Sequence, residues 1–225
     1  MSTAAVTSNT TDILSGNIVK NELVSYLKEL KNTCGTLSRE RIAVILGQWF
    51  HPLHYFPTFL SRLISVTPDI ETQTFISRIL WEELGEGDPQ RAHEVIYTQT
   101  MSDGGFTLHE IAGAEPLPAT RELIGGYETS SSAYLAGLGF LYGTEVVDLP
   151  MVSTIGELMR RSTGRRNLPW VNIHVAQEPG HVKSSNETLK PSFTAEEQRQ
   201  IVENAERMWR LWINFFKSIR KEIQH

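Results

Sequence analysis

The chain has 225 residues, 40% hydrophobic and 21% charged, a composition typical of one compact domain with a core of ordinary size. Its formal net charge of -5 gives no basic footprint for nucleic acid, and its single cysteine excludes an intrachain disulfide and a cysteine-rich zinc site. We therefore expect one domain, residues 1–225, with no nucleic-acid partner.

The first residues, MSTAAVTSNTTD, are small and polar, so residues 1–12 are expected to be flexible. They have neither the basic nor the apolar part of a signal peptide, and no apolar run in the chain reaches 18 residues. With a single cysteine, these features predict a soluble, cytoplasmic protein that has no membrane partner.

Hydrophobic periodicity predicts helices in the first third of the chain. Apolar residues recur at steps of three and four over residues 18–31, as on one face of an amphipathic helix. A second helix is expected over residues 38–50. A third is expected over 53–66, ending before a Thr-Pro pair, with a kink or break at Pro57.

The middle of the chain predicts two helices joined by a tight turn. The first covers residues 69–84 and is stopped by Gly85. The sequence GEGD makes the turn, and Pro89 suits the first turn of the next helix, which covers 90–101 and carries His93.

Four further helical segments are expected. Residues 119–147 form one glycine-weakened helix or two, and 153–161 form a short one. The segment 168–182 is expected to be distorted or to end near Pro179. The last helix begins with a capping-box pattern at residues 194–197. Seven to nine helices without a strand pattern predict an all-α bundle.

Glu145 is the first candidate for chemistry. Helical steps place Tyr142, Leu138 and Leu135 on its face, so its carboxylate is expected to point toward the core. A buried carboxylate requires a cation, a metal or a raised pKa. The alternative is that this glycine-rich helix turns Glu145 to the solvent.

Glu83 and His93 form a second candidate group, because the short turn between their helices lets both side chains reach one point. Glu82, Glu86 and Glu94 are alternatives. A surface cluster of acids at a helix-helix turn would explain the same pattern.

His174, Glu178 and His181 form the third group, since steps of four and three align them on one helical face. Imidazole nitrogen with carboxylate oxygen suits iron, manganese or zinc. An exposed helix with two histidines is the alternative, and Pro179 weakens the one-face argument because it would distort the helix.

Together the groups place three glutamates and three histidines on four helices, as in two-metal sites of helical bundles, although no Glu-x2-His pair occurs twice. The order is Glu-x9-His in EELGEGDPQRAH, a lone Glu in LYGTE, and His-x3-Glu-x2-His about thirty residues later. In this order the chain resembles the haem-oxygenase-like diiron oxidases and oxygenases, over roughly residues 40–215.

The resemblance implies a haem-oxygenase-like helical bundle that binds two Fe2+ ions per chain and uses O2 as co-substrate. The iron ligands it implies are Glu83, His93, Glu145, His174, Glu178 and His181. Glu86 is the runner-up for Glu83, and many members have Asp where Glu178 stands.

The activity that the resemblance implies is oxidation of a small amino acid or amine, by N-oxygenation, desaturation or C-C cleavage. Three alternatives stay open: a fatty-acid decarboxylase-type diiron oxidase, a TenA- or PqqC-like enzyme without a diiron centre, and a metal-free helical interaction module. TenA-like catalysis uses a cysteine on an inner helix, and Cys34 lies far upstream of that position.

Other side chains suggest how a substrate would be bound. Four arginines form a basic stretch that would either clamp a substrate carboxylate or simply be solvated. They are Arg160, Arg161, Arg165 and Arg166. His54, in the kinked helix, would line the pocket or play a structural role, as would His51 and His109.

The last helix suggests a possible homodimer. It carries Trp209, Trp212, Phe215 and Phe216 on more than one side, which is more aromatic surface than one core face needs. Either a second subunit or the other helices of the same chain would cover it.

Overall fold

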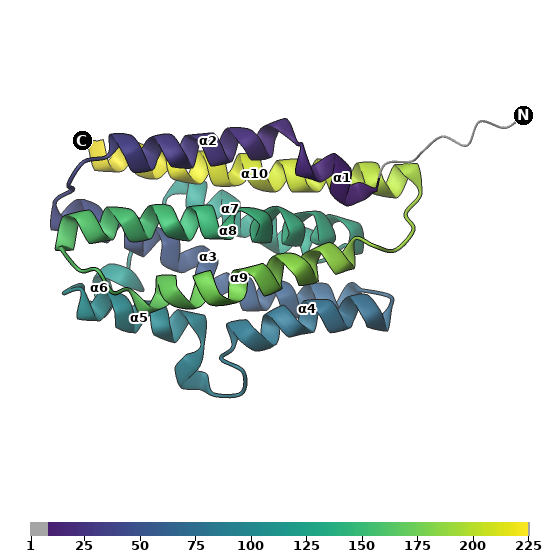
Figure 1. Cartoon of the computed structure of the whole chain (residues 1–225), viewed down its shortest axis with the longest axis horizontal. Helices are drawn as coiled ribbons and strands as arrows, with labels where there is room; N and C mark the ends of the chain where they lie inside the picture. Colours follow the sequence, from purple (N-terminus) through teal and green to yellow (C-terminus); the bar gives the residue numbers. More distant parts are fainter. Residues whose placement is uncertain (1–8, 225) are drawn as a thin grey trace, which may run out of the picture.

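The computed structural model describes residues 9–224. Within this part of the chain the regular structure is entirely helical, with ten α-helices, one 3-10 turn and no strand (Figure 1). Two of the α-helices, α1 and α6, are short, and the others have 11 or more residues. The all-α prediction is confirmed. Of the segment 1–12, residues 1–8 lie outside the described residues, and α1 begins at Thr10.

The elements follow one another in this order: α1 (Thr10–Ser15), α2 (Ile18–Thr33), α3 (Arg39–Val66), α4 (Ile70–Glu83), η1 (Pro89–Arg91), α5 (His93–Asp103), α6 (Leu108–Ile111), α7 (Pro118–Ser130), α8 (Tyr134–Thr163), α9 (Pro169–Thr188) and α10 (Ala195–Gln224).

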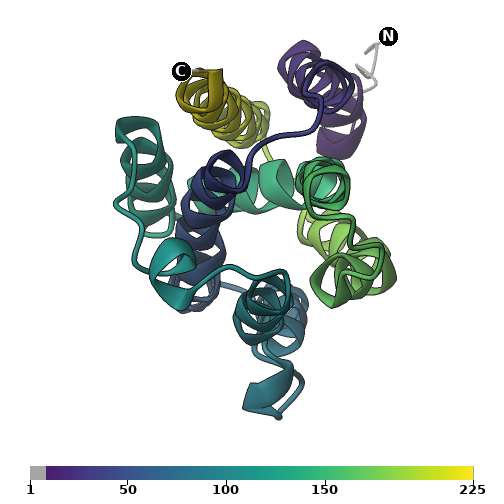
Figure 2. The same cartoon turned by 90° about the vertical axis from the view of Figure 1, so that its left-hand side faces the viewer.

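Helix α8 is the central element of the bundle and packs against α10, α9, α2, α3 and α7. Figure 1 shows α2 lying along α10 on one side of the bundle and α4 and α5 on the other. The end-on view in Figure 2 has the same order from top to bottom. By length and composition α8 could cross a membrane, but 67% of its most apolar window is buried inside the protein. A long apolar helix that is mostly buried in this way is typical of the core helix of a bundle.

Two glycines of α8 allow α10 to approach closely. A Cβ added at Gly139 would lie 2.4 Å from the main-chain carbonyl oxygen of Ile201, and one at Gly143 would lie 3.1 Å from the Cβ of Met208. The indole Nε1 of Trp209 donates a hydrogen bond of 2.8 Å to the Gly143 carbonyl. The glycines that weaken helix propensity therefore serve the packing that holds α8 in place.

Helix α10 begins as its sequence predicts. The main-chain N–H and hydroxyl of Thr194 each donate a hydrogen bond of 2.8 Å to the Glu197 carboxylate. The main-chain N–H of Glu197 donates to the Thr194 hydroxyl at 3.3 Å, which completes the capping box.

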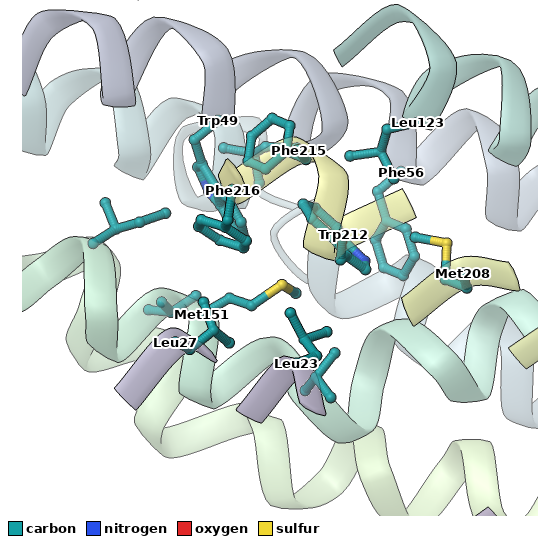
Figure 3. Packing of buried hydrophobic residues seen from close by; sticks show 14 of the residues in the cluster. Leu23, Leu27, Trp49, Phe56, Leu123, Met151, Met208, Trp212, Phe215 and Phe216 are labelled. Atoms are coloured by element: carbon teal, nitrogen blue, oxygen red, sulfur yellow. The ribbon is translucent and has the colours of Figure 1, made fainter. Parts of the chain in front are cut away.

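The aromatic residues of α10 build the core of the bundle. Trp209, Trp212, Phe215 and Phe216 are each 2% exposed or less. The ring of Trp212 stacks on that of Trp49 from α3 at 5.4 Å between centroids (Figure 3). Because the chain itself covers these side chains, they offer no surface to a second subunit, and the homodimer stays a prediction.

The prediction of two helices over residues 38–66 is wrong, because α3 is one helix that contains Pro52 and Pro57. A proline inside a helix costs about 3 kcal/mol. Thirteen residues of α3 are buried, most of them large and apolar, and each such side chain stabilises the fold by about 1.5–3 kcal/mol. Burial therefore outweighs both prolines. The end of α3 at Val66 agrees with the sequence.

The segment 119–147 divides, and its second part is longer than expected. Helix α7 ends at Ser130, and α8 then continues through Pro150 to Thr163, so that 153–161 is not a separate helix. As in α3, burial outweighs the proline, since α8 lies between its neighbours and is buried over most of its length.

Gly139→Ala is expected to lower the free energy of unfolding by about 1–3 kcal/mol, because the new methyl group would overlap the main chain of α10. Gly125→Ala in α7 is the matched control. Its Cβ would meet nothing within 4 Å, so the better helix propensity of alanine should leave stability equal or raise it by up to about 1 kcal/mol. Urea unfolding followed by circular dichroism measures both, and equal stability of the two variants would contradict the close approach.

Candidate metal centre

Four helices bring the six predicted ligand residues to one buried place. Glu83 ends α4, His93 begins α5, Glu145 lies in the middle of α8, and α9 supplies the other three. The exposed fractions are 6% for Glu83, 1% for His93, 2% for Glu145, 4% for His174, 3% for Glu178 and 2% for His181. The prediction that Glu145 points into the core is confirmed.

The turn between α4 and α5 places Glu83 beside His93. Gly85 and Gly87 have left-handed φ angles of 86° and 91°, and a Cβ at Gly85 would lie 2.2 Å from the carbonyl oxygen of Asp88. The helix expected over 90–101 begins only at His93, after a 3-10 turn. The Nδ1 atom of His93 lies 3.1 Å from Oε2 of Glu83.

Glu86, the alternative to Glu83, points elsewhere. It occupies a left-handed position in the turn, with φ 57°. Its carboxylate pairs with the guanidinium of Arg91 at 2.7 Å and is 35% exposed. The structure therefore places Glu83, and not Glu86, in the cluster.

The segment around Pro179 was expected to be distorted or to end there, but α9 continues as one helix to Thr188. Pro179 is exposed, and so is Val175, whose carbonyl loses its helical hydrogen bond to the proline. Because this carbonyl lies on the outer side of α9, water can satisfy it. The inner side of the helix keeps its three ligand residues on one face.

Each histidine of the cluster has one ring nitrogen in hydrogen-bonding contact with a partner that is not one of the six predicted ligand residues. These pairs are His93 Nε2 with Gln177 Oε1 at 2.6 Å, His174 Nδ1 with the Trp170 carbonyl at 2.8 Å, and His181 Nε2 with Glu82 Oε2 at 3.1 Å. Such outer partners fix the orientation of metal-binding histidines and decide which nitrogen faces the metal. Here the inward-facing atoms are Nδ1 of His93, Nε2 of His174 and Nδ1 of His181.

The inward-facing nitrogens lie within ligand distance of carboxylates. His181 Nδ1 is 3.4 Å from Glu145, 3.8 Å from Glu83 and 3.9 Å from Glu178. Two atoms bound to one ion can lie apart by at most the sum of their bond lengths, about 4.2 Å for nitrogen and oxygen ligands. These pairs can therefore share an ion without movement of the helices. One atom from each of Glu145, Glu178 and His181 lies within 4.8 Å of the others.

Four buried polar atoms of this cluster have no hydrogen-bond partner among the described residues. They are His93 Nδ1, Glu145 Oε1, Asp148 Oδ2 and Glu178 Oε1. Each such atom costs about 1–3 kcal/mol when it is left unsatisfied. Since all four belong to ligand types that suit iron, the residues present fit a metal centre.

Opposite charges inside the cluster stabilise one another in the metal-free protein. Burial would raise the pKa of Glu83, but the imidazoles of His93 and His181 lower it to about 2. Burial would lower the pKa of His181, but the carboxylates of Glu145 and Glu82 raise it to about 11. In the metal-free protein His181 therefore carries a proton at neutral pH.

For the neighbouring groups, burial and like charges shift the pKa values toward the neutral forms. Burial raises the pKa of Asp148 to about 6, and burial with the charges of Asp148 and Glu145 raises that of Glu178. Burial, with the charge of His93, lowers the pKa of His174 to about 4. His174 is therefore neutral near pH 7 and has a lone pair on Nε2.

A small cavity of about 30 Å³ adjoins the cluster. A cavity needs about 10–15 Å³ to hold a water molecule, so this one has room for a small molecule such as O2. One wall is polar and consists of Glu83, Glu145, Asp148, His174, Glu178 and His181. The other wall consists of Trp49, Pro52, Leu53, Phe56, Tyr127, Thr144 and Trp212, of which Figure 3 shows Trp49, Phe56 and Trp212.

Several residues singled out in the sequence lie away from this cavity. None of the four arginines proposed as a clamp lines it, and Arg161 donates hydrogen bonds to the Lys31 carbonyl and to Glu157. His54 is 64% exposed and pairs with Glu94 at 2.8 Å. His51 bonds the Ala114 carbonyl at 2.9 Å, which is a structural contact.

Two residues of the site had no place in the sequence analysis. Asp148 lines the cavity three residues after Glu145, and a search for acids on the Glu145 face of α8 would have found it. Gln177 precedes Glu178 and holds His93 from the neighbouring helix. No sequence pattern marks a neutral side chain in that role.

Solved structures with the same fold come from several bacteria. A CADD-like protein of unknown function from Nostoc punctiforme is 14% identical, with a TM-score of 0.75 and coverage of 95% of both chains. A domain of unknown function with a heme oxygenase-like fold from Shewanella denitrificans is 19% identical, with a TM-score of 0.69, covering 96% of this chain and 88% of that one. A TenA homologue from Pseudomonas syringae pv. tomato is 12% identical, with a TM-score of 0.71 and coverage of 94% and 91%.

These likenesses establish the haem-oxygenase-like fold that the resemblance implied. The comparison with curated proteins gives no match. The sequence profile of the family described as "Iron-containing redox enzyme" matches residues 44–213, which include all six predicted ligand residues. By this match over most of its length, the chain belongs to the iron-containing redox enzyme family.

Proposed function

We propose that this protein is a non-haem diiron enzyme that uses O2 to oxidise a small amine or amino acid. The observation that carries the proposal is the orientation of the three histidines. Each is held by an outer partner, so that its free nitrogen faces the buried carboxylates. A purely structural cluster has no need to leave four buried polar atoms without partners.

The iron ions would supply the electrons for the reduction of O2, and the protein would supply position and surroundings. Helices α4, α5, α8 and α9 hold the ligand residues from four directions. The wall of Trp49, Leu53 and Phe56 excludes water from the reacting side of the cavity.

The cavity wall also bears on the kind of substrate. No lysine or arginine is among the residues that line it, so the site offers no clamp for a substrate carboxylate. The other wall is largely aromatic and apolar, which favours an apolar body. Of the two classes that the sequence suggested, an amine suits this lining better, because an amine needs no clamp for a carboxylate. N-oxygenation, desaturation and C-C cleavage are the reactions we propose for it.

A TenA-like enzyme without a diiron centre is the second candidate, because a TenA homologue is among the structural neighbours. The only cysteine in the sequence is Cys34. It follows α2, is partly exposed, and does not line the cavity. The side chains at the cavity therefore support metal chemistry better than cysteine chemistry.

Anaerobic titration with ferrous iron tests the proposed function. We expect the wild type to bind about two equivalents per chain, as a centre of this ligand composition requires. His174→Ala should lose at least one of them, because the substitution removes one of the three inward-facing histidine nitrogens. His109→Ala, the same change at an exposed histidine, is the control and should bind as the wild type does. Absence of iron uptake by the wild type would refute the proposal.

Iron uptake should release about one to two protons per chain near pH 7. The inward nitrogen of His181 is protonated in the metal-free protein, where its pKa is about 11, and the pKa of Glu178 is raised as well. Because protons compete with the metal, affinity should rise as the pH increases from about 6 to about 8. Proton release in weakly buffered solution measures this, and binding without any release would show that the charges of the cluster are wrongly assigned.

Gln177→Leu should weaken the binding of one iron by about 10–100-fold, the usual cost of removing an outer partner of a metal-binding histidine. The substitution leaves the six predicted ligand residues in place, so the stoichiometry at saturating iron should stay the same. Gln99→Leu on the exposed side of α5 is the matched control. Unchanged affinity in Gln177→Leu would mean that His93 needs no outer partner.

A further inference from the structure

Asp148 is aimed at the same space as the six predicted ligand residues. It lies on α8 three residues after Glu145, so the two side chains share one helical face. Its side chain is 14% exposed, and its Oδ2 is buried without a hydrogen-bond partner among the described residues. It lines the cavity beside Glu145, His174 and Glu178.

Asp148 and His174 face each other without a hydrogen bond, because neither of the two facing atoms carries a hydrogen. His174 donates its Nδ1 hydrogen to the Trp170 carbonyl, so Nε2 has a lone pair. This lone pair faces Oδ2 of Asp148 at 3.9 Å, and both atoms are acceptors. Their separation is below the limit of about 4.2 Å for a nitrogen and an oxygen ligand on one ion. A cation between them would satisfy both.

The charge of the centre also calls for a fourth carboxylate. Two ferrous ions bring four positive charges, while Glu83, Glu145 and Glu178 bring three negative ones and neutral histidines bring none. A net charge in a buried site is costly. Asp148 supplies the fourth negative charge, and four carboxylates is also the number in two-metal sites of other helical bundles.

We propose that Asp148 is a seventh ligand residue of the centre and binds the same ion as His174. This inference rests on the proposed function, since it requires a centre that takes up metal. Asp148 and Glu178 line the same cavity, so an ion bound by Asp148 would lie near Glu178 as well.

The test compares the iron binding of Asp148→Asn, Asp148→Glu and the wild type in anaerobic titrations. We expect Asp148→Asn to keep one equivalent of ferrous iron and to bind the second at least about tenfold more weakly. Asp148→Glu restores a carboxylate and should recover part of the second affinity. Asp103→Asn, the same change at an exposed position on α5, should bind as the wild type does. Cobalt(II) in place of iron gives a second readout, because loss of a ligand alters its visible spectrum.

The possible outcomes separate this proposal from the function on which it rests. If the wild type binds two ions and Asp148→Asn binds two with the same affinity and cobalt spectrum, Asp148 is not a ligand and the proposed function stands. If the wild type binds no iron, both are overturned. Thermal unfolding of the metal-free proteins should show Asp148→Asn as stable as the wild type or more so, because the change removes a charge from a group of acids.

Discussion

The structure depends on the burial of carboxylates and imidazoles in one small space inside a helical bundle. Groups of this kind are costly to remove from water, and each is kept there by the charge or hydrogen bond of another. Glu83 depends on His93, and His181 depends on Glu82 and Glu145. Even so, four polar atoms of the cluster have no hydrogen-bond partner among the described residues. The surrounding helices must supply the stability that this arrangement lacks.

That stability comes from the opposite side of α8. The glycine face of this helix allows α10 to pack at main-chain distance, and the aromatic side chains of α10 fill the core against α3. Two and five residues after the second of these glycines, α8 presents Glu145 and Asp148 to the cluster. The same helix thus presents an apolar face to the core and an acidic face to the candidate metal centre.

Features that depend only on residues close together in the sequence could be predicted from it. They include the amphipathic α2, the capping box of α10 and the inward face of Glu145. Residues 38–66 were predicted to form two helices, and the segment 168–182 was predicted to be distorted or to end near Pro179, because prolines disfavour helix locally. In the structure, burial and the side of the helix that the freed carbonyl faces decide the outcome. Asp148 could have been found on the Glu145 face of α8, three residues further along the helix. Gln177 could not be assigned, because its role depends on a distance between two helices that no spacing along one helix contains.

The predicted ligand residues are spread over four helices, from Glu83 to His181, so metal binding at this cluster would be linked to folding. An unfolded chain cannot hold these side chains together, so an ion that binds here binds almost only to the folded protein. By mass action, an ion bound at one site with a free concentration 100 times its Kd would stabilise the fold by about 2.7 kcal/mol. The melting temperature of this protein would then report the supply of iron, and the loaded protein would resist proteolysis under conditions in which the metal-free form is degraded.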